Sequence, residues 1–453
     1  MALEQTEFIL ENVRCFKGEQ RAALRPITLL VGENSTGKST FLGCFRVVDQ
    51  LFHPSLRVGG SLPVDFNEEP FLMGSFRDIM RFQRGRDGRL NEFMLGIVVS
   101  PHSETGVAPY PIYFTFSESG PEPAITSYRM QFTEGLHLEV LREAGNKVRV
   151  SLPGHTETLD LRFCLPHDFV SRLGYLVGDG RHFNGKVQDV GRLSQFLSEL
   201  MGFECGPGSD ISGEELGLVL EALVCRDAHV IPIAPLRSKP QRVYSPVRES
   251  ASPEGEHIPM LLMRLDRTKK SQWDSLHDQL VDFGTQSGLF SDIKVKHHGS
   301  QMNDPFQLQV KVRSGSHANI MDVGYGVSQS LPILVDLMSA SKQTFLLQQP
   351  EVHLHPRGQA ELASLFVQSW KAQKNQFLIE THSDHVIDRV RISVRRGDLK
   401  PEDVSILYFE PKRNSVQIHN LSLDKQGNLL DAPPGYRDFF LRETDRLLGF
   451  RDD

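Results

Sequence analysis

The stretch GENSTGKS, residues 32–39, decides the fold that we expect of this chain. It matches the pattern G-x-x-x-x-G-K-[ST] in full, follows the apolar run ITLLV at 27–31 and leads into an expected helix that begins at Lys38. The glycines let the backbone wrap closely, so that successive N–H groups and the helix N-terminus point at phosphate oxygens. We expect Lys38 to reach the β and γ phosphates of ATP and Ser39 to ligate Mg²⁺.

The alternative is a glycine-rich turn that binds nothing, and the strand before the loop and the helix after it argue against that. We therefore predict that the whole loop binds ATP. Its residues are Gly32, Glu33, Asn34, Ser35, Thr36, Gly37, Lys38, Ser39 and Thr40.

Composition bounds the class of protein. With 453 residues, the chain is long enough for two or three domains or for one large α/β domain with insertions. No apolar run reaches the roughly 18 residues that a membrane span needs, and the start MALEQTEFIL lacks the layout of a signal peptide. The five cysteines form no C-x-x-C pair. We expect a cytoplasmic protein. The net charge of -7 gives no global attraction to nucleic acid.

Strands and helices are expected to alternate at both ends of the chain, with a different pattern between them. From about residue 93 to 152, segments such as IYFTF and KVRVSL predict an antiparallel sheet. Apolar residues at helical spacing predict helices at 193–200, 216–223 and 273–283. No heptad pattern persists between 53 and 320, so we expect no long coiled coil. The predicted fold is α/β, a P-loop ATPase core with an antiparallel β lobe and a helical insertion.

Four parts are predicted along the chain. Residues 1–90 carry the N-terminal half of the core with the phosphate loop, and residues 91–230 form the inserted antiparallel and helical lobe. Residues 231–317 are a connecting helical and β segment. Residues 318–453 form the C-terminal half of the core.

A second anion-binding device is predicted at DVGYGVSQ, residues 322–329. Two glycines lead into a helix whose expected N-cap is Ser328, and a helix N-terminus attracts anions. Since the first loop already serves the phosphates of its own subunit, the second suggests recognition of a neighbour's nucleotide. An ordinary helix start is the alternative. The residues of this segment that we assign to trans recognition are Gly324, Gly326, Ser328 and Gln329.

These segments, together with LLQQPEVHLHP at 346–356 and ETHS at 380–383, resemble an ABC-type ATPase head of the branch that includes RecF, structural-maintenance-of-chromosomes (SMC) heads and overcoming-lysogenization-defect ATPases. The chain is most similar to stand-alone AAA-labelled ATPases whose C-terminal part is a domain of unknown function. IAPLRSKPQRVY at 233–244 and PPGYRDFFLRETDRLL at 433–448 resemble that group too. The resemblance implies a Walker A loop at 32–40, a signature at 324–329, the end of Walker B and the D-loop at 351–356, and a switch histidine at His382.

Glutamines stand where the ABC pattern has acids. Gln348 then takes the place of the acid that orients a water on Mg²⁺, and Gln349 the place of the acid that polarises the attacking water. Glutamine carries no charge and is a poor proton acceptor, so we expect ATP binding with slow hydrolysis. Glu351 is the nearest carboxylate and our candidate general base; bracing of the D-loop is its alternative role. His382 is the third candidate catalytic residue, as a hydrogen-bond donor to the γ phosphate.

The resemblance also implies ATP-driven dimerisation of two heads, and it leaves two functions open. The first is a nucleotide-gated sensor or scaffold that controls a separate effector, a nuclease or toxin, as in the Septu and PARIS types of anti-phage defence. The second is a DNA-repair or chromosome-handling head that binds duplex DNA directly. A fused Toprim nuclease is disfavoured because no D-x-D follows His382.

Several side chains have both a functional and a plain interpretation. The best local feature for DNA is DRVRISVRRG at 388–397, followed by KVKHHG at 294–299; a solvated helix face is favoured for the first. His353 and His355 are better read as D-loop packing than as metal ligands. Arg237, Arg242 and Tyr244 either sense nucleotide or brace the fold, and the sequence does not decide between these roles.

Overall fold

The computed structural model describes residues 6–52, 64–82, 90–99, 109–120, 122–131, 137–143, 148–152, 155–159, 230–246 and 251–436. The predicted helices at 193–200 and 216–223 lie outside these residues.

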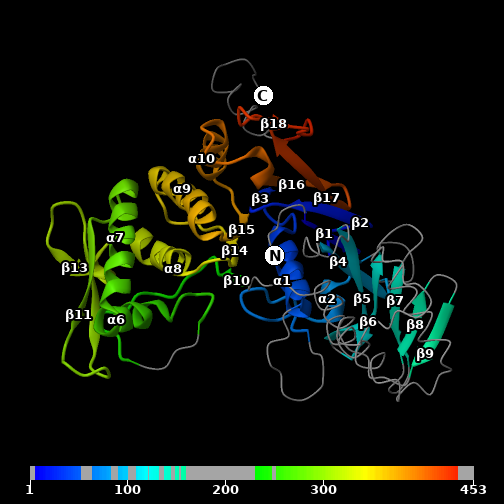
Figure 1. The fold of residues 1–453 in the computed structure, drawn as a ribbon, viewed down its shortest axis with the longest axis horizontal. Coiled ribbons are helices and arrows are strands. Elements are labelled where there is room, and N and C mark those ends of the chain that lie inside the picture. Colours follow the sequence, from blue (N-terminus) through cyan, green and yellow to red (C-terminus); the bar gives the residue numbers. More distant parts are fainter. Residues whose placement is uncertain are drawn as a thin grey trace, which may run out of the picture.

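A seven-stranded sheet forms the centre of the molecule (Figure 1). Its order is β10 (Val230–Ile233), β14 (Thr344–Gln348), β15 (Gln376–Glu380), β3 (Ile27–Gly32), β16 (Val404–Lys412), β17 (Ser415–Leu423) and β18 (Leu429–Leu430). The first five strands are parallel and the last two are antiparallel. Strands β14 and β15 are buried at every position, as expected of parallel strands covered on both faces. The parallel strands bring residues distant in sequence together at their carboxyl ends.

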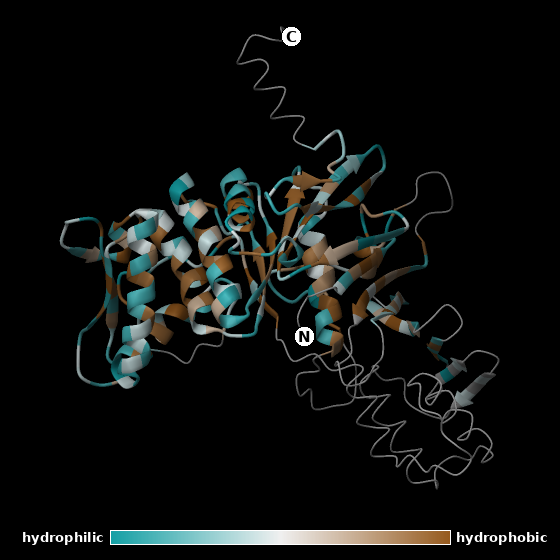
Figure 2. Cartoon of the chain, turned by 45° about the horizontal axis from the view of Figure 1, so that its top comes forward, coloured by the Kyte–Doolittle hydropathy of each residue, from teal (hydrophilic) through white to brown (hydrophobic). Residues whose placement is uncertain are grey.

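Helices cover both faces of this sheet. Alternate residues of one strand point to opposite faces, so Leu346 packs in the cluster that contains α1 (Lys38–Phe52), while Leu347 packs in the cluster of the other helices. Those helices are α8 (Tyr325–Ser339), α9 (Pro356–Gln373) and α10 (Asp384–Arg395). Helices α1 and α8 therefore lie on opposite faces of the sheet. Figure 2 shows apolar residues concentrated between the layers and polar residues on the outer helix surfaces.

An antiparallel sheet packs on the other side of α1. Its strands, in spatial order, are β2 (Glu19–Leu24), β1 (Thr6–Glu11), β4 (Glu92–Val99), β5 (Tyr110–Ser119), β6 (Glu122–Gln131), β7 (His137–Arg142), β8 (Val148–Leu152) and β9 (His155–Leu159). The short helix α2 (Phe76–Ile79) packs beside β5. Phe8 and Phe45 make an edge-to-face contact with ring centroids 5.6 Å apart, which ties this sheet to α1.

A third group of elements lies at the opposite end of the molecule, at the left of Figure 1. It contains α6 (Ile258–Thr268), α7 (Lys270–Ser287) and a three-stranded sheet of β11 (Asp292–His297), β12 (Phe306–Lys311) and β13 (His317–Asn319). The short 3-10 helix η2 (Ile320–Asp322) connects this sheet to α8, and η3 (Pro401–Asp403) precedes β16.

The predicted fold class is confirmed: an α/β P-loop core, an antiparallel lobe beside it, and helices inserted between its strands. Among the described residues the longest helices have 18 residues, so no long coiled coil is present there. None of the described helices is both long and apolar enough to cross a membrane. The four sequence boundaries stay a prediction.

One local prediction is wrong. Helix α8 begins at Tyr325 with Gly324 as N-cap, not at Ser328. Ser328 is buried in the first turn, and its hydroxyl donates to the carbonyl oxygen of Tyr325 at 3.0 Å. The glycines allow the helix to begin one turn earlier than the serine suggested. Helix α10 is capped by Ser383, whose hydroxyl accepts from the Val386 N–H at 3.2 Å.

Candidate nucleotide-binding site

The predicted phosphate loop joins β3 to α1, and two of its glycines cannot be replaced without a clash. Gly32 has φ 144°, and a Cβ there would lie 2.7 Å from the carbonyl oxygen of Phe409. Gly37 has φ 87°, and its Cβ would lie 2.6 Å from Sγ of Cys15. These conformations wrap the loop closely around the space above the N-terminus of α1.

Lys38 lies at the centre of this loop. Its Nζ donates to the carbonyl oxygens of Gly32 at 3.1 Å and Glu33 at 2.7 Å, both in its own loop. Burial lowers the pKa of Lys38, and the charges of Glu380 and Glu33 oppose that shift. The Lys38 amine thus donates to neutral carbonyl oxygens, which a charged phosphate oxygen can replace as the acceptor.

Ser39 contacts a residue that the sequence analysis did not assign. Its hydroxyl donates to Oε2 of Glu380 at 2.7 Å. Glu380 is the last residue of β15, which pairs directly with β3 in parallel, so its carboxylate meets the start of α1. Burial raises the pKa of Glu380, whereas the Ser39 hydroxyl and the Lys38 charge lower it. A carboxylate beside the predicted metal ligand is the donor that Mg²⁺ prefers.

The other loop residues divide into exposed and packed ones. Glu33, Asn34 and Ser35 are exposed at the tip of the loop. The Thr36 hydroxyl is turned inward and donates to the Glu33 carbonyl oxygen at 2.8 Å, while the Thr40 hydroxyl accepts from Arg14 at 2.9 Å. The side chains of Thr36 and Thr40 therefore hold the loop in shape.

The two glutamines lie at the carboxyl end of β14, beside Glu380. Gln348 is buried, and its Oε1 has no hydrogen-bond partner. Gln349 has φ 45°, and its N–H donates to the carbonyl oxygen of Glu380 at 2.8 Å. The positions expected for the acids thus carry uncharged side chains, and the carboxylate at this corner comes from the neighbouring strand.

Glu351 connects the turn after β14 to the end of β15. Its Oε1 accepts from the Thr381 hydroxyl and from the N–H of His382, both at 2.8 Å. Its Oε2 is buried without a hydrogen-bond partner. Burial raises the pKa of Glu351, and the hydrogen bond from the His382 backbone is the largest opposing effect. The side chain therefore braces the two strand ends, and its role as general base stays a prediction.

His382 has an exposed side chain at the same edge of the sheet. Partial burial lowers the pKa of His382, and the charge of Lys38 lowers it further. The imidazole is therefore neutral at pH 7, the form in which one ring nitrogen donates and the other accepts.

In the predicted signature at 324–329, the first two residues are exposed and the polar side chains are buried. Gly324 and Tyr325 are exposed at the N-terminus of α8, whereas Gln329 is buried. The Tyr325 ring meets the His353 ring edge-on, with centroids 5.2 Å apart, so the signature adjoins the predicted D-loop. A Cβ on Gly326 would lie 2.8 Å from the His353 carbonyl oxygen, which explains the second glycine.

Arg237, in the loop after β10, is the least satisfied charged group of the described residues. It is 4% exposed, and its Nε, Nη1 and Nη2 atoms all lack a hydrogen-bond partner. Burial lowers the pKa of Arg237 to about 10, and the charge of Glu351 opposes the shift, so the guanidinium stays charged at neutral pH. Burying an unpaired polar group costs about 1–3 kcal/mol, and more for a charge.

The other residues left open in the sequence analysis are structural. Arg242 forms an exposed ion pair with Asp322 at 2.6 Å, and the Tyr244 ring stacks on Phe306. His355 caps α9 by accepting from the Arg357 N–H at 3.3 Å. No group of three or more His, Cys, Asp or Glu side chains in the described parts of the chain is arranged to hold a metal ion.

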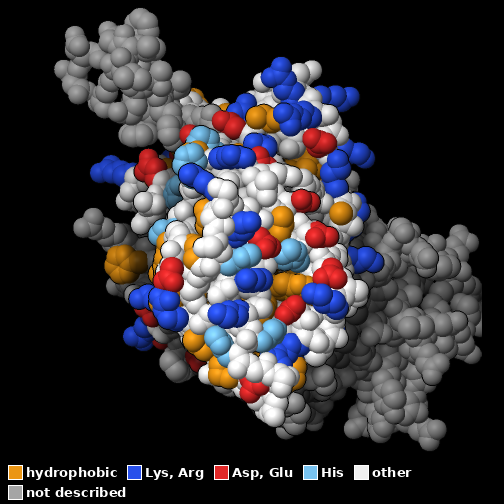
Figure 3. All heavy atoms as spheres, turned by 90° about the vertical axis from the view of Figure 1, so that its left-hand side faces the viewer, with side chains coloured by type: hydrophobic (Ala, Val, Ile, Leu, Met, Phe, Trp, Pro, Cys, Tyr) orange, Lys and Arg blue, Asp and Glu red, His pale blue; other side chains and the backbone are white. Residues whose placement is uncertain are grey.

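The two basic segments offer no uniform basic surface. Arg389 pairs with Glu361 at 3.2 Å and Arg391 with Asp388 at 2.9 Å, which leaves Arg395 and Arg396 exposed. Figure 3 views the end of the molecule formed by α7 and the β11–β13 sheet, where basic, acidic and histidine side chains are interspersed. Such mixing favours a solvated surface.

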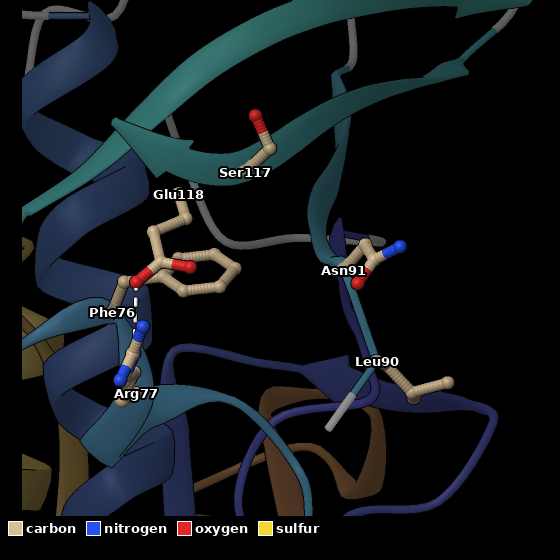
Figure 4. Close-up of a pocket in the computed structure, with 6 residues that line it drawn as sticks. All are labelled: Phe76, Arg77, Leu90, Asn91, Ser117 and Glu118. Atoms are coloured by element: carbon tan, nitrogen blue, oxygen red, sulfur yellow. Dashed lines mark hydrogen bonds and ion pairs between the residues drawn. The ribbon is translucent and has the colours of Figure 1, made fainter. Parts of the chain in front are cut away.

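A pocket of about 690 Å³ lies elsewhere, between α2 and strands β4 and β5 (Figure 4). Its lining includes the ion pair of Arg77 with Glu118 at 2.9 Å, and none of the predicted site residues contributes to it. The pocket therefore belongs to the antiparallel lobe and not to the phosphate loop.

The residues at the P-loop fit a nucleotide with Mg²⁺. A Cβ at Gly32 or Gly37 would clash, the Lys38 amine donates to two carbonyl oxygens of its own loop, and the Ser39 hydroxyl donates to a carboxylate. Backbone N–H groups, a cation and an oxygen ligand pair are the groups that a triphosphate and its metal ion require.

Three solved structures are similar to this chain at low identity. The Smc head domain from Pyrococcus furiosus, with an extended coiled coil and bound to the C-terminal domain of ScpA, has 10% identity and a TM-score of 0.44 over 98% of this chain and 99% of that chain. The SmcHead bound to the C-winged helix domain of ScpA has 10% identity and a TM-score of 0.43, with coverage of 92% and 98%. The SMC head domain from Thermotoga maritima has 9% identity and a TM-score of 0.40, with coverage of 91% and 97%.

No curated protein matches the chain. One family model matches a segment that begins after the P-loop and ends beyond His382. Residues 246–387 match the AAA ATPase domain family.

Proposed function

We propose that this chain binds ATP with Mg²⁺ between two copies of itself and hydrolyses it slowly, as a nucleotide-gated switch. The observation that carries the proposal is the contact of Ser39 with Glu380 beside Lys38, within a complete P-loop. Because β3 and β15 are adjacent parallel strands, the loop after β3 and the carboxylate that ends β15 lie together. They supply backbone donors for phosphate, the Lys38 cation and a carboxylate beside the predicted metal ligand Ser39.

Each residue has a defined part in this proposal. Backbone N–H groups of residues 33–39 and the Lys38 amine would bind the phosphates, and Ser39 and Glu380 would hold the metal ion. When bound, Mg²⁺ neutralises charge on the phosphate oxygens. Gln348 can accept a hydrogen bond from a metal-bound water, as its buried Oε1 has no other partner.

Slow turnover follows from the uncharged β14 end. We assign Glu351 as the general base because burial raises its pKa and leaves Oε2 free of hydrogen bonds. Gln349 orients the nucleophile without accepting its proton, and neutral His382 donates to the γ phosphate. Glu351 also holds the ends of two strands together, so its carboxylate has little freedom to move toward an attacking water. Slow hydrolysis of this kind suits a nucleotide-dependent switch more than a motor.

The second copy is expected at the N-terminal end of α8. Helix α8 lies on the face of the sheet opposite α1, so a subunit's own signature does not face its own phosphate loop. Leu236, Met321 and Tyr325 are 72%, 46% and 46% exposed near this helix end. Large apolar side chains at a helix N-terminus with exposed glycine N–H groups suit a partner that brings an anion with it.

The role of the switch rests on the sequence resemblance alone. By that resemblance the chain acts in the cytoplasm and controls a separately encoded nuclease or toxin in bacterial anti-phage defence. An adjacent nuclease or toxin gene would support this assignment, and a DNA-repair gene cluster would favour the DNA-handling alternative.

Self-association is the first test. We expect the mass measured by sedimentation velocity to increase to that of a dimer or larger oligomer on addition of ATP and Mg²⁺, because nucleotide joins the loop of one copy to α8 of another. Tyr325→Asp should abolish this increase by placing a like charge against the incoming phosphates. Lys425→Asp, an exposed change far along the chain, serves as control. A mass that is monomeric with and without nucleotide contradicts the proposal.

A further inference from the structure

Three buried polar side chains without full hydrogen bonding lie at the same edge of the central sheet. They are Arg237, Gln348 and Glu351. Strands β10 and β14 pair in parallel with Ile233 opposite Leu347, so the loop that carries Arg237 follows β10 beside the turn that carries Glu351. Native proteins rarely leave such groups unpaired, and a catalytic role is one of the recognised reasons for an exception.

The backbone of Arg237 is tied to the predicted partner-facing helix. Gln329 of α8 accepts from the Arg237 N–H at 3.3 Å, and its amide donates to the Arg237 carbonyl oxygen at 3.4 Å. Both backbone polar groups of Arg237 are thus held by one side chain, which is itself 2% exposed. A shift of the start of α8 would therefore move the Arg237 backbone.

The Arg237 side chain is coupled electrostatically to the end of strands β14 and β15. The Glu351 charge acts on its guanidinium, and Glu351 Oε1 holds the Thr381 hydroxyl and the His382 N–H. The preceding residue, Glu380, holds Ser39 of the phosphate loop. Hydrogen bonds therefore connect α8 to the Arg237 backbone and Glu351 to the end of β15, and the electrostatic interaction of Arg237 with Glu351 joins the two.

We propose that Arg237 is a positioning residue that pairs with the free Oε2 of Glu351 when a second copy seats on α8, and so makes hydrolysis depend on dimerisation. The inference rests on the proposed function of ATP hydrolysis between two copies. The inference adds Arg237 as the residue through which binding of the second copy at α8 affects the general base, Glu351. In the single chain Oε2 of Glu351 has no hydrogen-bond partner. In the dimer the guanidinium keeps the buried carboxylate ionised through one lone pair of Oε2, and the second lone pair remains for the proton of the attacking water.

The test compares Arg237→Met, Arg237→Lys and the matched control Lys239→Met in the full chain. Lys239 is an exposed cation on the same loop. We expect Arg237→Met to lower kcat by about 30-fold, which is within the range of a coupling between two sites. The affinity for ATP should change by less than about threefold, and the variant should still form the ATP-dependent oligomer. Arg237→Lys should restore part of the loss because it keeps the charge and loses the planar fork. Lys239→Met should match the wild type.

A double-mutant cycle separates positioning from mere packing. If Arg237 acts through Glu351, Arg237→Met combined with Glu351→Gln is no slower than Glu351→Gln alone. Additive losses, equal losses in ATP binding and turnover, or an unchanged kcat for Arg237→Met would overturn the inference. If Arg237→Met does not fold, Arg237→Lys decides, since a kcat equal to that of the wild type would contradict the need for the fork.

Failure of the inference and failure of the proposed function give different results. Wild-type turnover that Lys38→Ala abolishes, together with a fully active Arg237→Met, removes the inference and keeps the ATPase. A wild type without Lys38-dependent turnover removes both.

Discussion

Lys38→Ala is expected to weaken ATP binding by about 30- to 100-fold and to reduce turnover to background. The side chain is a buried cation whose three protons are shared between loop carbonyls and, in the nucleotide complex, phosphate oxygens. A charge-assisted hydrogen bond contributes about 1.5–3 kcal/mol, and each 1.4 kcal/mol is a factor of ten in affinity. Equilibrium binding of ATP, measured by calorimetry, checks the change.

The control for this variant is Lys425→Ala, which removes an exposed lysine outside the nucleotide site. It should bind ATP like the wild type. Equal affinities for wild type and Lys38→Ala would show that the loop at 32–39 is not a phosphate site, whatever its shape.

Glu380→Gln should lower turnover by about 100- to 1000-fold while ATP affinity falls less than about tenfold. Removing one electrostatic group aimed at developing charge has effects of this size on the chemical step. The amide can still accept the hydrogen bond from Ser39, so the loop keeps its shape, but the negative charge beside the metal corner is lost. Single-turnover hydrolysis and nucleotide binding, measured separately, distinguish the two effects.

Two further variants serve as a control and as a comparison for Glu380→Gln. Glu402→Gln removes an exposed carboxylate of η3 and should leave turnover unchanged. Glu351→Gln should also retain binding and lose turnover if Glu351 is the base. Full activity of Glu380→Gln would contradict a role of Glu380 at the metal ion and would favour Gln348, which the sequence alone suggested.

The P-loop could be predicted from sequence because its determinants are local. Spacing of Gly32, Gly37 and Lys38 after an apolar strand fixes the turn, and the structure places them as expected. Such features depend on neighbours within a few residues along the chain.

Glu380 could not be assigned in this way. Its partner Ser39 lies 341 positions away in sequence, and the contact exists because β15 pairs with β3 and not because of any pattern around Glu380. The only sequence signal was an acid that ends a buried strand.

Arg237 illustrates the same limit. Its sequence context, IAPLRSKP, shows a loop after a strand but not that the guanidinium is buried, nor that Gln329 of α8 holds its backbone. Ser328 shows a different error: its residue type predicts an N-cap, but the glycines let α8 begin at Tyr325, so Ser328 lies inside the first turn.

The most direct test of the central claim is the release of inorganic phosphate from ATP by the purified chain, with identically purified Lys38→Ala as the blank. The account predicts slow release that requires Mg²⁺, stops on addition of a chelator, and is absent from Lys38→Ala. Release that is equal in the two preparations, or no release from the wild type at protein concentrations that permit self-association, would contradict it.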